Sequence, residues 1–260
     1  MTEETNASES EVQITPVEAS VLLSGAEWDP KLLATTLAQE WEITVPEKDL
    51  PADASESLVF EAEGAVIAVK LFEEPLPAEM ARMHAAMNPL WPQAGAMAQL
   101  HRAHLAVAAI PKTASLVEAA LVLVKVVSSL CNQPSALAID TGSTILGTDG
   151  YREGATVMKG GELPLFNLVT FAIAKADETN FVAFTMGMSF LGHNELEISP
   201  TAEKPEVIQE FLYTVASYTL KTGKGLRDGQ ILGLHPEKAQ AVRYAESSMI
   251  PGLKTMQITL

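Results

Sequence analysis

The sequence contains one cysteine among its 260 residues, and this scarcity excludes several kinds of protein. A single cysteine cannot form an internal disulfide, so the chain is not a small secreted scaffold held together by cross-links. Cys131 directly follows the apolar run Leu116–Leu130. We therefore expect its thiol to be buried and unreactive.

Long hydrophobic runs are also missing. The first eleven residues are acidic and polar, and they lack the basic start and apolar stretch of a secretory signal. The longest apolar-rich run, 114–130, is short for a membrane span and contains Glu118 and Lys125. The sequence thus predicts a cytoplasmic protein without a membrane span. Residues 1–15 have hardly any apolar side chains, and we expect them to form a disordered acidic tail.

Basic residues are scarce, since 17 Lys and Arg face 33 Asp and Glu and the formal net charge is −16. This balance opposes binding to nucleic acid phosphates and favours encounter with a basic protein. The segment 40–79 holds eleven acids against Lys48 and Lys70, a net charge of −9. Two interpretations stay open, an ordinary solvated rim and a surface that steers a basic partner. The candidate partner-binding residues are Glu47, Asp49, Asp53, Glu56, Glu61, Glu63, Glu73 and Glu74.

Apolar residues make up 47% of the chain, which is enough to fill a substantial core. Alternating and helical spacings predict the elements strand 17–23, helix 30–41, hairpin 58–72, helices 78–87 and 93–102, strand 104–110, helix 115–130, strand 136–140, hairpin 168–188, strand 195–198 and helix 205–221.

The order of these elements predicts an α+β fold of two loosely similar modules, each an antiparallel sheet with helices packed on one face. We expect residues 16–260 to form a single domain. A division into two closely packed halves, 16–112 and 113–260, stays open as an alternative.

The segment Asp140-Thr141-Gly142-Ser143 matches the way aspartic proteases present a catalytic carboxylate. That chemistry needs two carboxylates that share one proton, and the sequence contains no second such segment. The surrounding pattern also lacks a strand on each side, because a long helix is predicted just before the strand. We therefore expect an ordinary turn at this position.

His101 and His104 are spaced so that both imidazoles could lie on one helical face as metal ligands. No glutamate follows in the pattern of a zinc hydrolase, and the other histidines occur in unrelated contexts. A structural role at a helix-to-strand junction is favoured over metal binding. The glycine pairs, such as Gly160-Gly161, lack the spacing of a phosphate-binding loop, so we predict no cofactor.

Four segments together resemble a bacterial domain-of-unknown-function family, the one numbered 4261. They are Val21 to Ser24; Trp91 followed by His101 to Val107; Thr185 to Gly187 through Gly192 to Glu195-Leu196-Glu197-Ile198; and Asp228-Gly229 through Ser248-Met249 to Leu260. The resemblance covers nearly the whole chain. It implies a bacterial cytoplasmic protein without agreed catalytic residues, and acidic α+β domains of this kind serve by analogy as immunity or accessory proteins in toxin systems.

Taken together, the sequence predicts a non-catalytic cytoplasmic binding protein, an immunity or accessory protein that neutralises a basic bacterial toxin. The alternative is a hydrolase or metal-dependent enzyme that uses His101, His104 and Asp140. The sequence favours a protein partner, no nucleic acid and no membrane, and it leaves the oligomeric state open.

Overall fold

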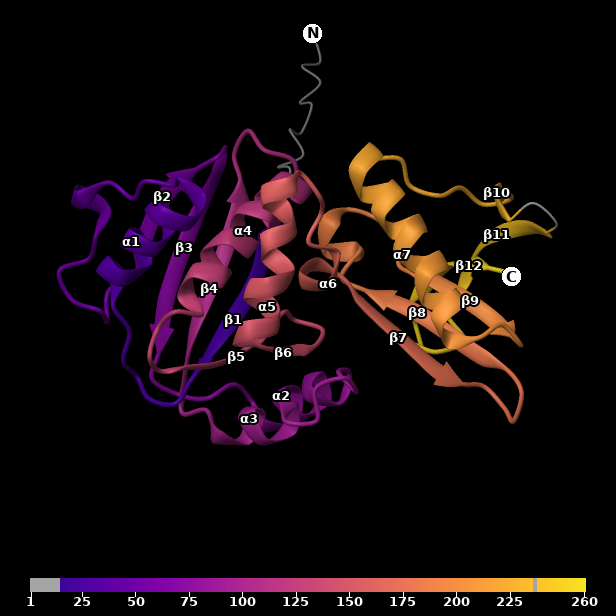
Figure 1. The fold of residues 1–260 in the computed structure, drawn as a ribbon, viewed down its shortest axis with the longest axis horizontal. Helices are drawn as coiled ribbons and strands as arrows, with labels where there is room; N and C mark the ends of the chain where they lie inside the picture. The colour runs from indigo at the N-terminus through magenta and orange to yellow at the C-terminus, as the bar shows by residue number, and fades with distance from the viewer. Residues whose placement is uncertain (1–14, 236–237) are drawn as a thin grey trace, which may run out of the picture.

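A computed structural model describes residues 15–235 and 238–260, and it contains two six-stranded sheets that stand side by side (Figure 1). The first sheet and its helices are built from the first part of the chain, and the second sheet from the last part. The expected tail, 1–15, lies outside the described residues apart from Thr15.

The first sheet is antiparallel throughout, with the spatial order β2-β3-β4-β1-β5-β6. Alternate side chains of its strands are buried, as the twofold repeat of an extended chain requires. β2 has only one neighbour and forms an edge of the sheet. The strands are β1 (Val17–Leu23), β2 (Leu58–Ala62), β3 (Ala65–Phe72), β4 (Ala103–Pro111), β5 (Ala136–Asp140) and β6 (Ile145–Gly147).

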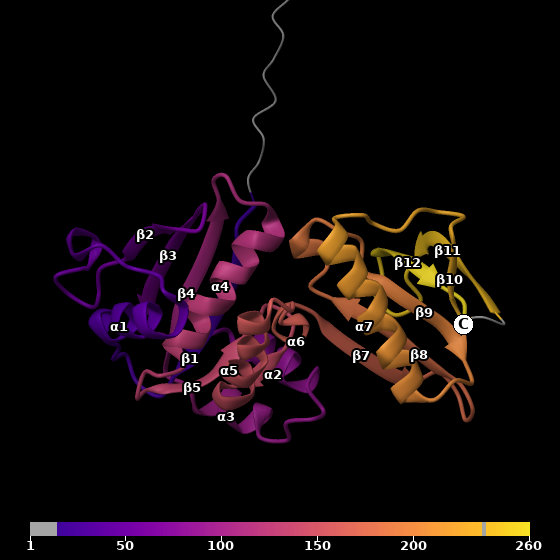
Figure 2. The ribbon, with the colours of Figure 1, turned by 45° about the horizontal axis from the view of Figure 1, so that its top comes forward.

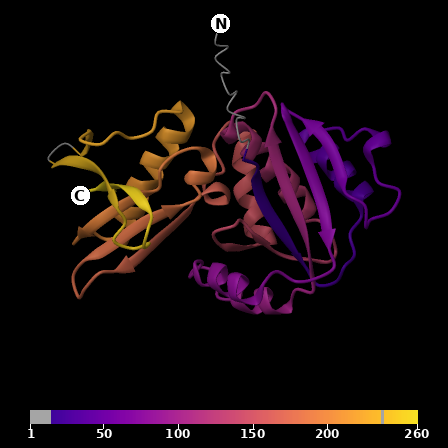
Figure 3. The same cartoon turned by 180° about the vertical axis from the view of Figure 1, so that it is seen from behind.

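Helices cover the two faces of the first sheet unequally. One face carries α1 (Pro30–Trp41), α4 (Leu116–Leu130) and α5 (Thr148–Ala155). On the other face, α2 (Ala78–Ala86) and α3 (Ala94–Leu100) cover one end only. Figure 3 shows that the middle of β3, β4 and β1 has no helix in front of it on that face. We call this uncovered part the open face.

The central helix of the first sheet, α4, begins at a capping box. The Ser115 hydroxyl accepts from the Glu118 amide at 3.2 Å, and the Glu118 carboxylate accepts from the Ser115 amide at 2.7 Å. These bonds satisfy amide groups that lack partners inside the helix. Most of the following positions are apolar and buried, so α4 forms the middle of the main core.

The second sheet has the order β10-β11-β12-β9-β8-β7 and is mixed, because β9 and β12 are parallel while the other pairs are antiparallel. Helix α7 (Pro205–Thr222) crosses one face of this sheet (Figure 2). The strands are β7 (Thr170–Lys175), β8 (Phe181–Met186), β9 (Leu196–Thr201), β10 (Ile231–His235), β11 (Lys238–Glu246) and β12 (Lys254–Ile258).

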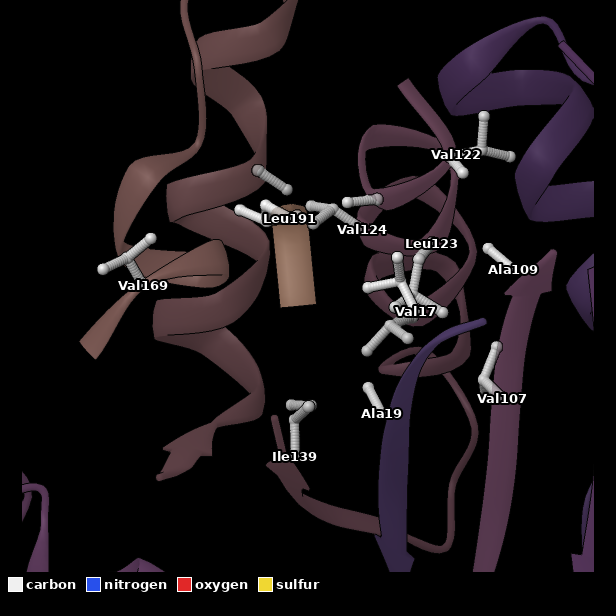
Figure 4. Packing of buried hydrophobic residues seen from close by; sticks show 14 of the residues in the cluster. Val17, Ala19, Val107, Ala109, Val122, Leu123, Val124, Ile139, Val169 and Leu191 are labelled. Atoms are coloured by element: carbon white, nitrogen blue, oxygen red, sulfur yellow. The ribbon is translucent and has the colours of Figure 1, made fainter. Parts of the chain in front are cut away.

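One hydrophobic core joins the two sheets through α4. The short helix η3 (Ser189–Leu191) of the second part contacts α4, and its Leu191 lies beside Val124 (Figure 4). Val169, which follows α6 (Leu165–Leu168), belongs to the same cluster. The two sheets therefore share buried surface rather than being linked by the chain alone.

The α+β class is confirmed, with two features that the sequence did not predict. The second sheet is mixed rather than purely antiparallel, and α2 and α3 pack on the face opposite α4. The division at 112/113 would fall within the first sheet, because β5 and β6 come later in the chain. No helix in the described ranges is both long and apolar enough to cross a membrane.

One expectation about Asp140 was wrong. β6 pairs with β5, so the segment 141–144 is the turn of a hairpin and does lie between two strands. A strand of three residues is too short to show an alternating pattern, and sequence periodicity therefore missed it.

Candidate functional site

The eight predicted partner-binding carboxylates occupy two separate places. Glu61 and Glu63 lie at the β2–β3 hairpin, where Glu61 pairs with Lys112 at 2.6 Å and Glu63 pairs with Lys125 at 2.6 Å. Both are thus partly neutralised by lysines. Glu73 and Glu74 lie at the opposite end of the first sheet, since the length of β3 separates them from the hairpin, and the remaining four lie in the connection between α1 and β2. Eight residues of strand span roughly 25 Å.

The register of the hairpin brings Glu56 to the same end of the sheet as Glu73. Leu58 pairs with Val69, so Glu56 lies near the level of Leu71, only two residues before Glu73. The short helix η1 (Glu47–Asp49) precedes β2 in the same connection and contacts it. We call the six carboxylates of this connection and of the residues that follow β3 the acidic end: Glu47, Asp49, Asp53, Glu56, Glu73 and Glu74.

The acidic end is open to solvent, and Lys48 lies between Glu47 and Asp49 in η1. All of its members are exposed except Asp49, which is half-buried. Within the described part of the chain, none of the six has a basic side chain at ion-pair distance. Asp53 accepts from the Ser55 amide at 2.8 Å, and this bond lowers the pKa of its carboxyl. Asp53 therefore stays negatively charged at neutral pH.

The histidines proposed as metal ligands are engaged by the backbone. His101 Nδ1 lies 2.6 Å from the Ala98 carbonyl, and its Nε2 accepts from the Leu76 amide at 2.8 Å. Burial lowers the pKa of His101, in agreement with a neutral ring. His104 donates through Nδ1 to the Glu74 carbonyl at 2.9 Å. These contacts give both rings a structural role.

Asp140 is instead brought together with His84, which lies on α2. His84 Nδ1 is 2.8 and 2.9 Å from the two carboxylate oxygens, and the Gly142 amide donates to Oδ1 at 2.7 Å. Asp140 is 3% exposed and His84 is 9% exposed. Sequence analysis missed this pair because 56 residues separate its members.

A cleft of about 350 Å³ opens above this pair on the open face. Because Asp140 occupies Nδ1, Nε2 is the nitrogen of His84 that remains for a bound molecule. An imidazole held by a carboxylate in this way can accept a proton or hydrogen-bond a ligand. In the described ranges, no three His, Cys, Asp or Glu side chains are grouped as metal ligands would be. The residues that define the cleft are Glu18, Ser20, Lys70, Phe72, Met80 and His84.

Two buried glutamates of the second sheet have a different character. Glu195 is 4% exposed, and it accepts hydrogen bonds from three successive amides, those of residues 187, 188 and 189, at 2.9 to 3.2 Å. The hydroxyls of Thr185 and Ser189 add two further bonds at 2.8 Å. Glu195 thus joins the end of β8 to the start of η3.

Glu197, two residues further along, is 1% exposed and holds the turn between β11 and β12. It accepts from the Ser247 and Ser248 hydroxyls, each at 2.6 Å, and from Thr255 at 3.1 Å. Burial acts to raise the pKa of Glu197, but these bonds outweigh it and lower the pKa below its usual value.

The lowered pKa of Glu197 predicts an acid-dependent loss of stability. A depressed carboxyl pKa in the folded state stabilises the protein above the unfolded pKa of about 4.3, and this stability is lost as the pH falls through the folded pKa. Urea unfolding measures the free energy of unfolding at each pH. Between about pH 6 and 3.5, this free energy should decline less steeply with falling pH for Glu197→Gln than for the wild type. Equal slopes for the two proteins would contradict the assignment.

Cys131 agrees with the expected inert thiol. It keeps some surface exposure, but its Sγ lies 3.2 Å from the Val127 carbonyl, and burial raises the pKa of the thiol to about 12. A thiolate is the reactive form, and almost none is present at neutral pH.

Comparison with known proteins identifies one family. Residues 184–259 match a model described as a domain of unknown function (DUF4261). The predicted family is thereby confirmed over this range, which contains the third and fourth resembling segments except for Leu260. The first two segments lie before it. None of the curated proteins or solved structures matches the chain.

Proposed function

We propose a binding function for this chain, which carries a domain of the DUF4261 family at residues 184–259. In this proposal the protein is non-catalytic and acts in the bacterial cytoplasm, where the acidic end contacts a basic protein. The most concrete partner is a basic toxin that the chain neutralises as an immunity or accessory protein.

One observation carries the proposal, the exposure of carboxylates without ion-pair partners in the connection before β2 and directly after β3. Like charges on a surface repel one another, and an approaching positive surface relieves that repulsion. Complementary charge also raises the rate at which partners meet. Glu61 and Glu63 contribute less, because Lys112 and Lys125 already pair with them.

The geometry gives less support to the enzyme alternative as the sequence framed it. His101 uses both ring nitrogens in backbone contacts, and Asp140 is bound by His84 rather than by His101 or His104. The three residues therefore do not point at one common ligand.

Capture of partners from a lysate of the source organism tests the proposal. The bait is the full chain, compared with an acidic-end variant that combines Glu47→Gln, Glu56→Gln, Glu73→Gln and Glu74→Gln. The matched control combines Glu153→Gln, Glu178→Gln, Glu206→Gln and Glu210→Gln, four exposed positions elsewhere with the same change in net charge.

We expect the wild type and the control to retain one basic protein at low ionic strength, and the acidic-end variant to lose it. Salt at about 0.5 M should weaken the capture, because exposed charges are then screened. Recovery of the same proteins by all three baits, or of none at low salt, would overturn the proposal.

A further inference from the structure

We propose that the cleft on the open face binds an amphipathic organic acid, with its carboxylate at Lys70 and a hydroxyl at its far end hydrogen-bonded to His84. This site borders the acidic end, because its lining residues Phe72 and Leu76 flank Glu73 and Glu74 in the chain, and it does not depend on a macromolecular partner. The proposal is based on the register of the first sheet, the buried His84–Asp140 pair and the position of Lys70.

Strand register places the polar groups of the cleft along one line across the sheet. Lys70 pairs with Ala106, Ala106 pairs with Ser20, and Ser20 pairs with Asp140. Directly paired residues lie on the same face of a sheet. Lys70 and Asp140 are therefore three strand spacings apart, about 14 Å. The small side chains of Ala106 and Ser20 leave the space between them open.

The β3 side of the cleft attracts the anionic end of a ligand. Lys70 is exposed, and its Nζ lies 5.2 Å from the centre of the Phe72 ring. Throughout the described ranges, no carboxylate lies at ion-pair distance from it. Glu18 stands on the rim at β1 and repels anions there. The two charges together direct a carboxylate towards Lys70.

The opposite side of the cleft offers a hydrogen bond at a fixed position. Asp140 holds the ring of His84 through Nδ1, and the Gly142 amide holds Asp140 in turn. The ring is thus oriented before any ligand arrives, and Nε2 can accept from a hydroxyl. A preorganised partner of this kind costs a ligand little ordering entropy.

Apolar side chains cover the stretch between these two ends. Phe72 of β3, Met80 of α2 and Leu76 of the connection between them line the cleft, and Ala68 and Ala108 widen its floor. A volume of about 350 Å³ suits a small molecule rather than a folded partner. An aliphatic chain with a carboxylate at one end and a hydroxyl at the other therefore matches both the shape and the polarity.

Isothermal titration with 8-hydroxyoctanoate as the probe tests the assignment on the full chain. Octanoate lacks the hydroxyl, and 1,8-octanediol lacks the charge. We expect each to bind the wild type about fivefold more weakly than 8-hydroxyoctanoate, the loss typical of one hydrogen bond or one exposed ion pair. No binding of 8-hydroxyoctanoate, or equal binding of the three molecules, would overturn the proposal.

Variants assign each end of the probe to its residue. Lys70→Gln should weaken the binding of 8-hydroxyoctanoate about fivefold and leave the binding of 1,8-octanediol unchanged. His84→Leu should bind octanoate and 8-hydroxyoctanoate equally, since leucine offers the hydroxyl no acceptor. Lys175→Gln, which changes an exposed lysine of β7, is the matched control and should bind the probe as the wild type does. If His84→Leu does not fold, the comparison of octanoate with 8-hydroxyoctanoate on the wild type still tests the contact of the hydroxyl.

Discussion

Replacement of Glu195 by alanine is expected to lower the free energy of unfolding by about 4 kcal/mol. The substitution leaves two buried amides, those of residues 187 and 188, and the partly buried amide of residue 189 without their common acceptor, together with two hydroxyls. Each buried donor left unpaired costs about 1 to 3 kcal/mol, and relaxation recovers part of the total. Urea unfolding measures the change directly, and the melting temperature should fall by roughly 10 °C.

Two companion variants distinguish this effect from a general loss of charge. Glu195→Gln keeps the volume and one acceptor oxygen, so we expect about half the loss seen with alanine. Glu210→Gln removes an exposed carboxylate of α7 and should change stability by less than about 0.5 kcal/mol. A Glu195→Ala protein as stable as Glu210→Gln would show that the amides find other partners.

Substitution of Gly187 by alanine is expected to destabilise the chain by a similar amount, about 4 kcal/mol, or to prevent folding. Gly187 has φ +119°, a conformation that side chains rarely adopt. An added Cβ would also collide with the carbonyl oxygen of Leu168, which belongs to the backbone and cannot rotate away. The yield of soluble protein and the melting temperature are the measurements.

Gly160→Ala provides the control for this prediction. Gly160 lies in η2 (Thr156–Gly160), and a Cβ there meets nothing within 4 Å. The variant should remain within about 1 kcal/mol of the wild type. If Gly187→Ala melts at the same temperature as Gly160→Ala, the backbone around Leu168 is not as constrained as the structure indicates.

These two predictions assign a structural role to the resembling segments within the DUF4261 range. Gly187 and Glu195 form one local assembly at the end of β8, and Glu197 anchors the turn before β12. Buried carboxylates with every oxygen hydrogen-bonded stabilise a particular backbone path. The matched range 184–259 therefore contains the buried carboxylates that hold these turns of the second sheet.

Local patterns predicted the elements with strong signals. Asp29 and Pro30 at the start of α1 and the alternation on both sides of Gly64 each depend on neighbouring residues. Such signals are readable without knowledge of the fold. The short elements β6 and α6 have too few residues to show a period, and β10 to β12 were not predicted either.

The candidate sites depended on distances that the sequence does not contain. His84 meets Asp140 only because α2 packs over the end of β5, and neither residue is distinctive alone. The acidic stretch was visible as composition, yet the length of β3 separates Glu63 from Glu73. Charge counts along a chain cannot show which carboxylates share a surface once strands intervene.

Association kinetics test the central claim, that the acidic end is the binding surface, most directly. The captured partner is measured against the wild type, the acidic-end variant and the charge-matched control over a range of ionic strengths. We expect the association rate constant of the acidic-end variant to fall about tenfold at low salt and to lose most of its salt dependence, while the control stays within about twofold of the wild type. Equal rate constants for the two variants would contradict the claim, because net charge alone would then account for the encounter.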